Sequence, residues 1–226
     1  MNPNQAEKDL NEIAKDKELI DSYMTYWESI TPKNNLNVFR RYIFSFLSVH
    51  TPWSANVRSF LLLDKEKNIE AFKNEEHIND LIKESRAGNH KIKAKVISKF
   101  ATDFDNDTDS FKLAPNENSQ KKRDLIMAKC FGLGPAKAAF ALEMCFPLTA
   151  QTVCLDTHLL QLYGFDDKVL RARAGRSTRA YNEMENHWLE YCRSLDIPPA
   201  IARAIWWDKK QQQTSSKYWT YVIEDK

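Results

Sequence analysis

A glycine turn between two helical segments is the stretch of the sequence best suited to binding a phosphate group. Gly132 and Gly134 flank Leu133, and Pro135 follows directly. Proline suits the first turn of a helix, because its missing N–H would have had no partner there. The glycines keep side chains away from the helix start, so its free backbone N–H groups can face an anion, while Leu133 fills the groove between the helices. The spacing predicts a helical hairpin over residues 120–146, either a phosphate clamp or a plain turn between packed helices.

A carboxylate follows the hairpin at the expected start of another helix. Asp156-Thr157-His158 stands between apolar residues, and Asp156 lies 22 positions after Gly134 (156 − 134). Aspartate is a favoured N-cap, because its side chain accepts hydrogen bonds from the first free N–H groups of the helix. A cap also holds a carboxylate in one orientation. Asp156 can therefore be a structural cap and a reactive group at once.

In this order and at this distance, the two motifs resemble the helix-hairpin-helix DNA glycosylase superfamily, which includes endonuclease III-like and 8-oxoguanine glycosylase-like enzymes. The resemblance covers about residues 36–165. It implies an all-α fold of two packed helical lobes with the active site between them. It also implies that Asp156 is the catalytic carboxylate. The residues that it places at the DNA are Gly132, Leu133, Gly134, Ala136, Lys137 and His50.

A third match lies upstream, in the stretch from Phe46 to Trp53. It resembles the Leu-Ser-x-Gln-Thr segment that borders the base pocket in several members of the superfamily, with His50 in place of the usual glutamine. That residue often fills the space left by the flipped base. A histidine interacting with free carbonyls at a helix end fits the sequence equally well. The residues expected around the base are Ser48, Thr51, Trp53 and His158.

The position of the lysine bears on the reaction. Bifunctional members carry a Schiff-base lysine four residues after the first hairpin glycine, and that position is Ala136 here. Lys137 comes one residue later, about 100° further around the helix. Its separation of 19 residues from Asp156 (156 − 137) nevertheless suits a bifunctional enzyme. We expect an enzyme that uses water, with Lys137 near phosphate or solvent. A glycosylase/lyase with Lys137 as nucleophile is the alternative.

The resemblance implies a DNA glycosylase that flips a damaged or modified base out of double-stranded DNA and hydrolyses its N-glycosidic bond. Asp156 would stabilise the positive charge that develops on the sugar. Two other functions fit the motifs. One is a DNA-binding module without activity, although such a module has no need of the carboxylate. The other is a glycosylase-fold enzyme that processes a modified pyrimidine in phage-type DNA.

The composition is that of a soluble globular chain, and residues 1–226 suit a single helical unit. The net charge of +2 excludes a polycationic coat protein, although Lys121-Lys122-Arg123 and the arginines from Arg171 to Arg179 form local basic clusters, as solvated faces or phosphate contacts. The four cysteines lack metal-site or iron–sulfur spacing, so we expect buried reduced thiols, no metal and no cofactor. Without a signal peptide pattern or an apolar run of roughly 20 residues, we expect an intracellular monomer away from membranes.

Helical periodicity runs through most of the chain, and glycine is scarce. The pattern predicts a surface loop over 104–120 and a polar tail over 211–226. Trp206 and Trp207 suit either an aromatic wall for the base or the core. The expected helices cover residues 19–30, 37–50, 57–62, 68–84, 91–104, 120–130, 135–146, 156–163, 177–194 and 198–211.

Overall fold

The computed structural model describes residues 2–166 and 177–211, and over these residues the chain forms eleven α-helices, two 3-10 helices and no strand. In chain order the elements are α1 (Asn4–Ala14), α2 (Lys17–Ser29), α3 (Asn35–Leu47), α4 (Trp53–Leu63), η1 (Glu70–Lys73), α5 (Glu75–Glu84), α6 (His90–Asn106), η2 (Thr108–Phe111), α7 (Ser119–Lys129), α8 (Pro135–Cys145), α9 (Thr157–Leu162), α10 (Arg179–Ser194) and α11 (Pro199–Lys210). The expected all-α fold is confirmed. Among the described helices, none has the length and apolar character needed to span a membrane.

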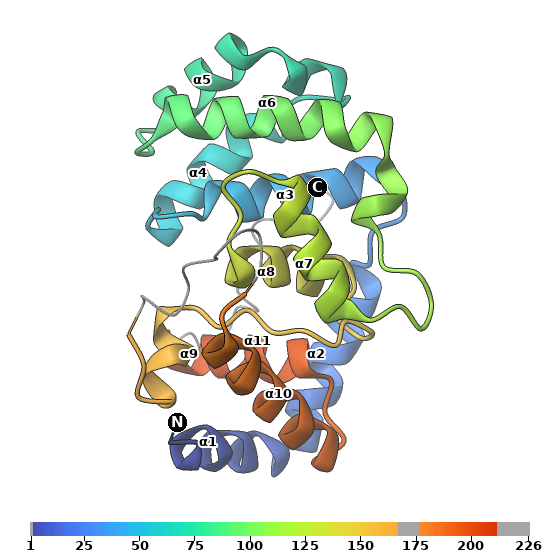
Figure 1. Ribbon diagram of the computed structural model, residues 1–226, viewed down its shortest axis with the longest axis vertical. Coiled ribbons are helices and arrows are strands. Elements are labelled where there is room, and N and C mark those ends of the chain that lie inside the picture. The colour runs from blue at the N-terminus through green and yellow to red at the C-terminus, as the bar shows by residue number, and fades with distance from the viewer. Residues whose placement is uncertain (1, 167–176, 212–226) are drawn as a thin grey trace.

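The helices gather in two lobes, with α7 and α8 between them (Figure 1). One lobe holds α3 to α6, and the other holds α9 to α11 together with α1 and α2. Two hydrogen bonds join the N-terminal helices to α11: Trp206 Nε1 donates to Asp9 Oδ2 at 2.8 Å, and the Tyr23 hydroxyl donates to Asp208 Oδ2 at 2.5 Å. Helices from both ends of the sequence therefore build the second lobe.

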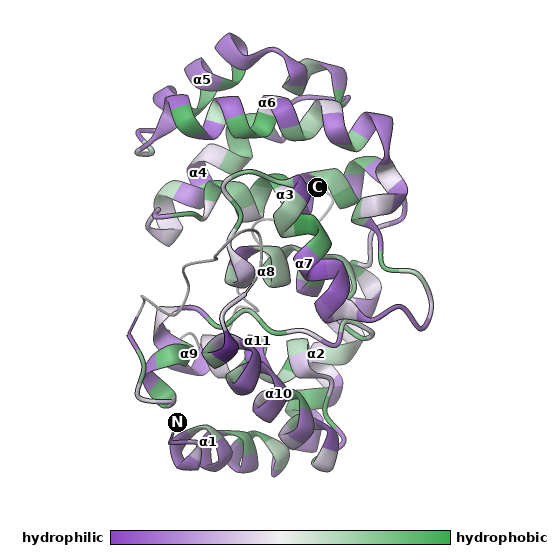
Figure 2. Ribbon diagram, in the orientation of Figure 1, coloured by the Kyte–Doolittle hydropathy of each residue, from purple (hydrophilic) through white to green (hydrophobic). Residues whose placement is uncertain are grey.

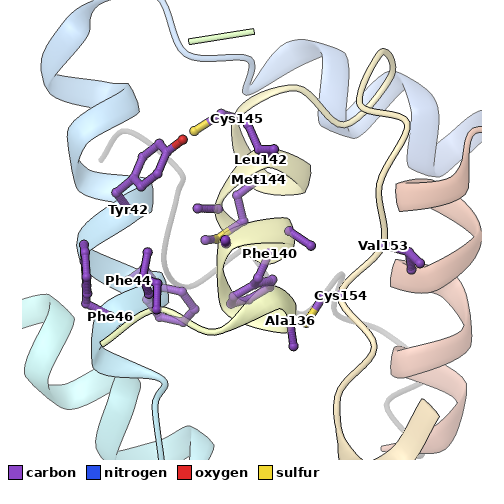
Figure 3. Close-up of a cluster of buried hydrophobic side chains, with 14 of the residues drawn as sticks. Tyr42, Phe44, Phe46, Ala136, Phe140, Leu142, Met144, Cys145, Val153 and Cys154 are labelled. Atoms are coloured by element: carbon purple, nitrogen blue, oxygen red, sulfur yellow. The ribbon is translucent and has the colours of Figure 1, made fainter. Parts of the chain in front are cut away.

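Helix α8 is the centre of the molecule. Each of its residues is buried except Lys137, because the helix is made of alanines and larger apolar residues, with Lys137 and Glu143 as its two charged residues. It lies between α3 and the extended segment 150–156 (Figure 3). The outer helices α1 and α10 are mainly hydrophilic in Figure 2, as expected of helices with one face in water. The second helix of the predicted hairpin is thus a core element.

An aromatic cluster fills the first lobe between α3 and α6. The rings of Phe39 and Phe100 stack with centroids 5.3 Å apart, and Tyr42 also stacks on Phe100 at 5.3 Å. Phe111 meets Phe100 edge-on at 5.2 Å, and both it and Phe104 are buried. The prediction of a surface loop over 104–120 is therefore wrong in part. Its two phenylalanines belong to the core, and η2 interrupts it.

The remaining helix predictions are confirmed to within a few residues, with two differences. Helix α1 was not expected, because its sequence is mainly polar and only Ala6, Leu10 and Ile13 are buried. The predicted helix over 68–84 is divided into η1 and α5. Asn74 causes the break, because its side chain accepts a hydrogen bond from His77 N at 3.1 Å and so caps α5.

The basic triplet Lys121-Lys122-Arg123 at the start of α7 was interpreted as a solvated face or a phosphate contact. Both interpretations are wrong for two of its three residues, because these are buried. Arg123 is buried and forms an ion pair with Glu185 of α10, which is also buried. Lys122 is buried and pairs with Glu117 at 3.1 Å. Buried cations are usually paired with a carboxylate, and both of these cations have one. This cluster joins helices and leaves Lys121 alone on the surface.

The remaining predictions about side chains have mixed outcomes. All four cysteines are buried free thiols, as expected. In the second basic cluster, Arg179 is exposed and pairs with Glu183 at 2.7 Å. The other arginines of that cluster and the predicted tail after Gln211 lie outside the described residues.

Candidate active site

The hairpin turn has the backbone that its glycines predict. Gly132 has φ +90°, a conformation that side chains rarely adopt, and a Cβ there would meet Val96 of α6 at 3.4 Å. Leu133 is buried beneath the turn. Gly134 is the N-cap of α8, where no side chain bonds to the helix end, and Pro135 begins the helix. The start of α8 is therefore open to an anion from outside the chain.

Asp156 is held at the opposite end of the extended segment from α8. Its Oδ1 accepts hydrogen bonds from the backbone N–H groups of His158 at 3.0 Å and Leu159 at 3.1 Å, so the side chain caps α9. Oδ2 has no hydrogen-bond partner among the described residues, and the side chain is half-buried. The cap therefore fixes one carboxylate oxygen and does not use the other.

The segment that leads to Asp156 is held by a buried carboxylate of α10. Glu185 Oε1 accepts hydrogen bonds from the Thr152 hydroxyl at 2.6 Å and from Val153 N at 3.2 Å. The Tyr181 hydroxyl donates to Val153 O at 2.7 Å. Arg123 neutralises Glu185 from the other side. Side chains thus replace the neighbouring strand that an extended segment usually has.

A second buried carboxylate holds the same segment from α8. Glu143 Oε1 accepts a hydrogen bond from Cys154 N at 2.8 Å, and Glu143 Oε2 pairs with Arg203 Nε of α11 at 2.6 Å. Burial raises the pKa of Glu143 to about 7, although Arg203 and the Cys154 N–H favour its charged form. Neither Glu143 nor Arg203 was singled out from the sequence. The one available signal was a glutamate inside the apolar run of α8.

Ala136 and Lys137 take different places on α8. Ala136 is buried and lies close to Cys154 (Figure 3), so a lysine at this position would extend toward the Asp156 segment. Lys137 is half-buried, and its ammonium lies 5.3 Å from the centre of the Phe140 ring. The side chain thus packs along its own helix, and the expectation that Lys137 lies near phosphate or solvent stays a prediction.

Burial and nearby charges both change the pKa of the Cys154 thiol. Burial raises its pKa to about 12; the nearby charges of Arg203 and Lys137 lower it, and those of Glu143 and Asp156 raise it. The Lys137 ammonium lies over the Phe140 ring, Asp156 caps α9, and no hydrogen bond or ion pair among the described residues joins the two.

The segment from Ser48 to Trp53 forms the turn between α3 and α4. The Ser48 hydroxyl donates to Ser45 O at 2.7 Å, and the Ser45 hydroxyl donates to Lys137 O at 2.6 Å, which joins this turn to the start of α8. His50 is exposed at its tip with φ +49°, and its ring has no hydrogen-bond partner among the described residues. The structure thus offers no carbonyl contact for the structural role of His50 and leaves the ring open to a partner.

A buried lysine supports this turn. Lys93 of α6 is 5% exposed, and its ammonium donates to the Thr51 hydroxyl, which in turn donates to Val49 O at 2.9 Å. Burial lowers the pKa of Lys93 to about 8, since no carboxylate among the described residues pairs with it. The Trp53 ring contacts Phe44 edge-on at 5.3 Å and so serves the core as well.

The two neighbouring tryptophans of α11 differ in burial. An aromatic wall for the base and a place in the core were the two roles considered for them. Trp206 is buried and bonds to Asp9 of α1, so it seals the core. Trp207 is half-buried, and its ring lies 5.1 Å from the ring of His158, the second residue of the helix that Asp156 caps. His158 therefore contacts α11, and the structure does not join it to the turn of Ser48 and Thr51. In the described part of the chain, no group of three His, Cys, Asp or Glu residues could hold a metal ion.

The open hairpin, the capped aspartate after it and the two helical lobes define the class: the chain has the helix-hairpin-helix DNA glycosylase fold. It is similar to the 8-oxoguanine DNA glycosylase of Methanocaldococcus jannaschii, with 17% identity and a TM-score of 0.70 over 90% of this chain and 94% of that one. The 8-oxoguanine DNA glycosylase of Thermotoga maritima gives 14% identity and a TM-score of 0.72 over 94% and 99%.

A structure of the Methanocaldococcus jannaschii 8-oxoguanine glycosylase/lyase in complex with 15mer DNA containing 8-oxoguanine is also similar, with 16% identity and a TM-score of 0.69 over 93% of this chain and 99% of that one. At these identities the likeness shows the fold. By sequence, no family model and no curated protein matches the chain.

Removal of Glu143 is expected to destabilise the protein strongly. Glu143→Ala takes the carboxylate away from Arg203 and from Cys154 N, and breaking a buried ion pair costs about 3–5 kcal/mol. Urea denaturation measures the loss. The matched control is Glu183→Ala, whose partner Arg179 is on the surface and whose loss should change stability little. Equal stabilities of the two variants would contradict the role given to Glu143.

Lys93→Met is expected to stabilise the protein by on the order of 1–3 kcal/mol at pH 7, because it removes a charge buried against a hydroxyl. The gain should be full below pH about 8 and shrink as pH rises toward 10.5. In that range the folded amine is neutral while the unfolded amine still holds its proton, so the wild type becomes more stable. Thermal unfolding at pH 7 and pH 10 tests this. A gain that does not change with pH would show that Lys93 is not buried as an ammonium.

Proposed function

We propose that the protein is a DNA glycosylase, which binds double-stranded DNA, flips out a damaged or modified base and hydrolyses its N-glycosidic bond. The observation that carries the proposal is the state of Asp156. One carboxylate oxygen is fixed by the N-terminus of α9, and the other faces no protein group among the described residues. Two further observations support this assignment. The buried carboxylates of Glu185 and Glu143 hold the segment before Asp156, and the fold is one that glycosylases share.

The chemistry follows from placing a carboxylate beside the sugar. As the bond to the base breaks, its electron pair leaves with the base, and positive charge develops on the sugar. The Asp156 carboxylate stabilises that charge and orients water, whose oxygen bonds to the sugar carbon. The proton released from water replaces the sugar on the base. No cofactor takes part in this sequence.

We further propose that water is the nucleophile, because the position of the Schiff-base lysine holds Ala136, which is buried against the Cys154 segment. Lys137 is the second candidate. Its ammonium lies 5.3 Å from the centre of the Phe140 ring, and its separation of 19 residues from Asp156 (156 − 137) suits a bifunctional enzyme. A rotation of the Lys137 side chain would be needed for attack.

On the DNA side, we propose that the N–H groups at the hairpin turn hold a backbone phosphate and that His50 fills the gap left by the flipped base. The open N-terminus of α8 and the exposed His50 ring support these roles. A turn built on Ser48 and Thr51 would then border the base. The first substrate to test is 8-oxoguanine, which the similar proteins are named for.

Base release is the test of the proposed function. Asp156→Asn should lower the rate at least about a hundred-fold while DNA affinity changes little, because asparagine can still cap α9 and lacks the charge. The matched control is Asp16→Asn, since Asp16 caps α2 in the same way, with Leu19 N at 3.0 Å. Duplexes should carry 8-oxoguanine, uracil, alkylated purines, thymine glycol and modified pyrimidines.

Three results of that assay would contradict the proposal. Near wild-type release by folded Asp156→Asn would remove Asp156 from the chemistry. Tight DNA binding without release of any base would identify a binding module. A pyrimidine altered but retained in the strand would identify a processing enzyme.

Borohydride trapping separates water from lysine. With Ala136 in the lysine position, the wild type should give little covalent protein–DNA complex, because borohydride reduces only a Schiff base to a stable bond. Lys137→Ala should leave that background unchanged, as should Lys121→Ala on the exposed start of α7. A strong trapped band that disappears in Lys137→Ala alone would make Lys137 the nucleophile.

A further inference from the structure

The first half of α6 carries a row of lysines on its surface. Lys91, Lys95 and Lys99 are all exposed and follow one another at a spacing of four residues, so their side chains lie along one side of the helix. Like charges at this spacing destabilise a helix. Lys99 pairs with Asp103 at 2.6 Å, but Lys91 and Lys95 have no acidic partner among the described residues. A row of this kind suits a polyanion.

A groove of about 410 Å³ lies between α6 and the entrance to the hairpin. Its apolar surface comes from α3, α6 and the residues at the end of α7. Its charged side chains are Lys95, Lys99, Asp103 and Lys129, of which Lys99 pairs with Asp103 and Lys129 with Asp107 at 2.6 Å each, so that the lining carries more positive than negative charge. The residues that line it are Phe46, Lys95, Val96, Lys99, Phe100, Asp103, Lys129, Cys130 and Phe131. An apolar groove with a basic edge fits a flat, uncharged ring attached to phosphates.

Phe131 stands at the edge of this groove with 77% of its surface exposed. No other large hydrophobic residue among the described ones is so exposed; Ile92 on α6 follows with 63%. A phenyl ring in water contributes nothing to the core, and it directly precedes Gly132 of the hairpin turn. Its position makes it a surface on which a base can stack.

We propose that this groove and the lysine row bind a single-stranded segment of DNA beside the hairpin. An unpaired base stacks on Phe131 and enters the groove, while the phosphates follow Lys91, Lys95 and Lys99. Aromatic rings beside a basic track are how proteins bind single strands, and the bases of a duplex are already stacked on one another. The inference rests on the proposed function in one respect, since the hairpin brings the DNA to this groove.

The consequence is a preference for DNA that is unpaired near the target base, such as a gap, a fork or an overhang. Blunt duplex DNA would use the hairpin and leave the groove empty. Base–aromatic stacking is worth ~1–3 kcal/mol per base, so an unpaired extension should raise affinity about 5- to 150-fold.

Fluorescence anisotropy at matched salt tests this with a blunt duplex and the same duplex carrying a single-stranded extension of about eight nucleotides at either end. Phe131→Ser should abolish the preference for the extension and leave the affinity for blunt duplex unchanged. Phe131→Trp should keep the preference. Because Phe131 is on the surface, these variants should fold as the wild type does.

Salt dependence tests the lysine row. Lys95→Gln should reduce the slope of log affinity against log salt by about 0.7 on the extended DNA, the contribution of one phosphate contact on a single strand. Lys17→Gln is the charge-matched control, because Lys17 is exposed on α2 in the other lobe. Equal effects of the two substitutions would remove the lysine row from the site.

Other outcomes would overturn the inference or the proposed function separately. Equal wild-type affinity for blunt and extended DNA overturns the inference, as does a Phe131→Ser variant that weakens both equally. If the wild type releases a base but shows no preference for the extension, the glycosylase proposal stands and this site falls. If it prefers the extension through Phe131 but releases no base, the site stands and the glycosylase proposal falls.

Discussion

The structure depends on an extended segment that has no strand to pair with. Residues 150–156 carry the chain from the hairpin to Asp156, and residues 152–155 among them are buried. A buried N–H without a partner is costly, so side chains must supply the hydrogen bonds. The Ser119 hydroxyl accepts a hydrogen bond from Gln151 N at 2.9 Å. The carboxylates of Glu185 and Glu143 accept hydrogen bonds from Val153 N and Cys154 N. These side chains therefore fix the position of Asp156 at the end of the segment.

Each of the two buried carboxylates brings an arginine with it. Glu143 is neutralised by Arg203 of α11, and Glu185 by Arg123 of α7. A carboxylate alone in the interior would take up a proton, and each arginine opposes this. The ion pairs therefore tie α7, α8, α10 and α11 to one segment. The two ion pairs thus join the central helices α7 and α8 to the second lobe.

Local patterns predicted the parts of this structure that depend on neighbouring residues. Helical periodicity located the helices, Gly132 and Gly134 located the hairpin, and the position of Asp156 predicted its cap. Contacts between distant residues could not be predicted in this way. Glu143 and Arg203 stand 60 positions apart (203 − 143), and nothing in either local sequence indicates the other. The same holds for Phe111, Lys93 and Thr51, whose environments depend on how α3, α4 and α6 pack within the first lobe.

The second lobe is discontinuous in sequence, and this sets the order in which it can be completed. Helix α2 ends at Ser29 and its partner α11 begins at Pro199, 170 residues later (199 − 29). At about 5–20 residues per second, a ribosome needs roughly 10–30 seconds to make that stretch. The lobe of α3 to α6 can pack during this interval. The apolar faces of α1 and α2 stay exposed until α11 has been made. Helices α10 and α11, which hold the segment before Asp156 through Glu185 and Arg203, are therefore made after the first lobe and the hairpin.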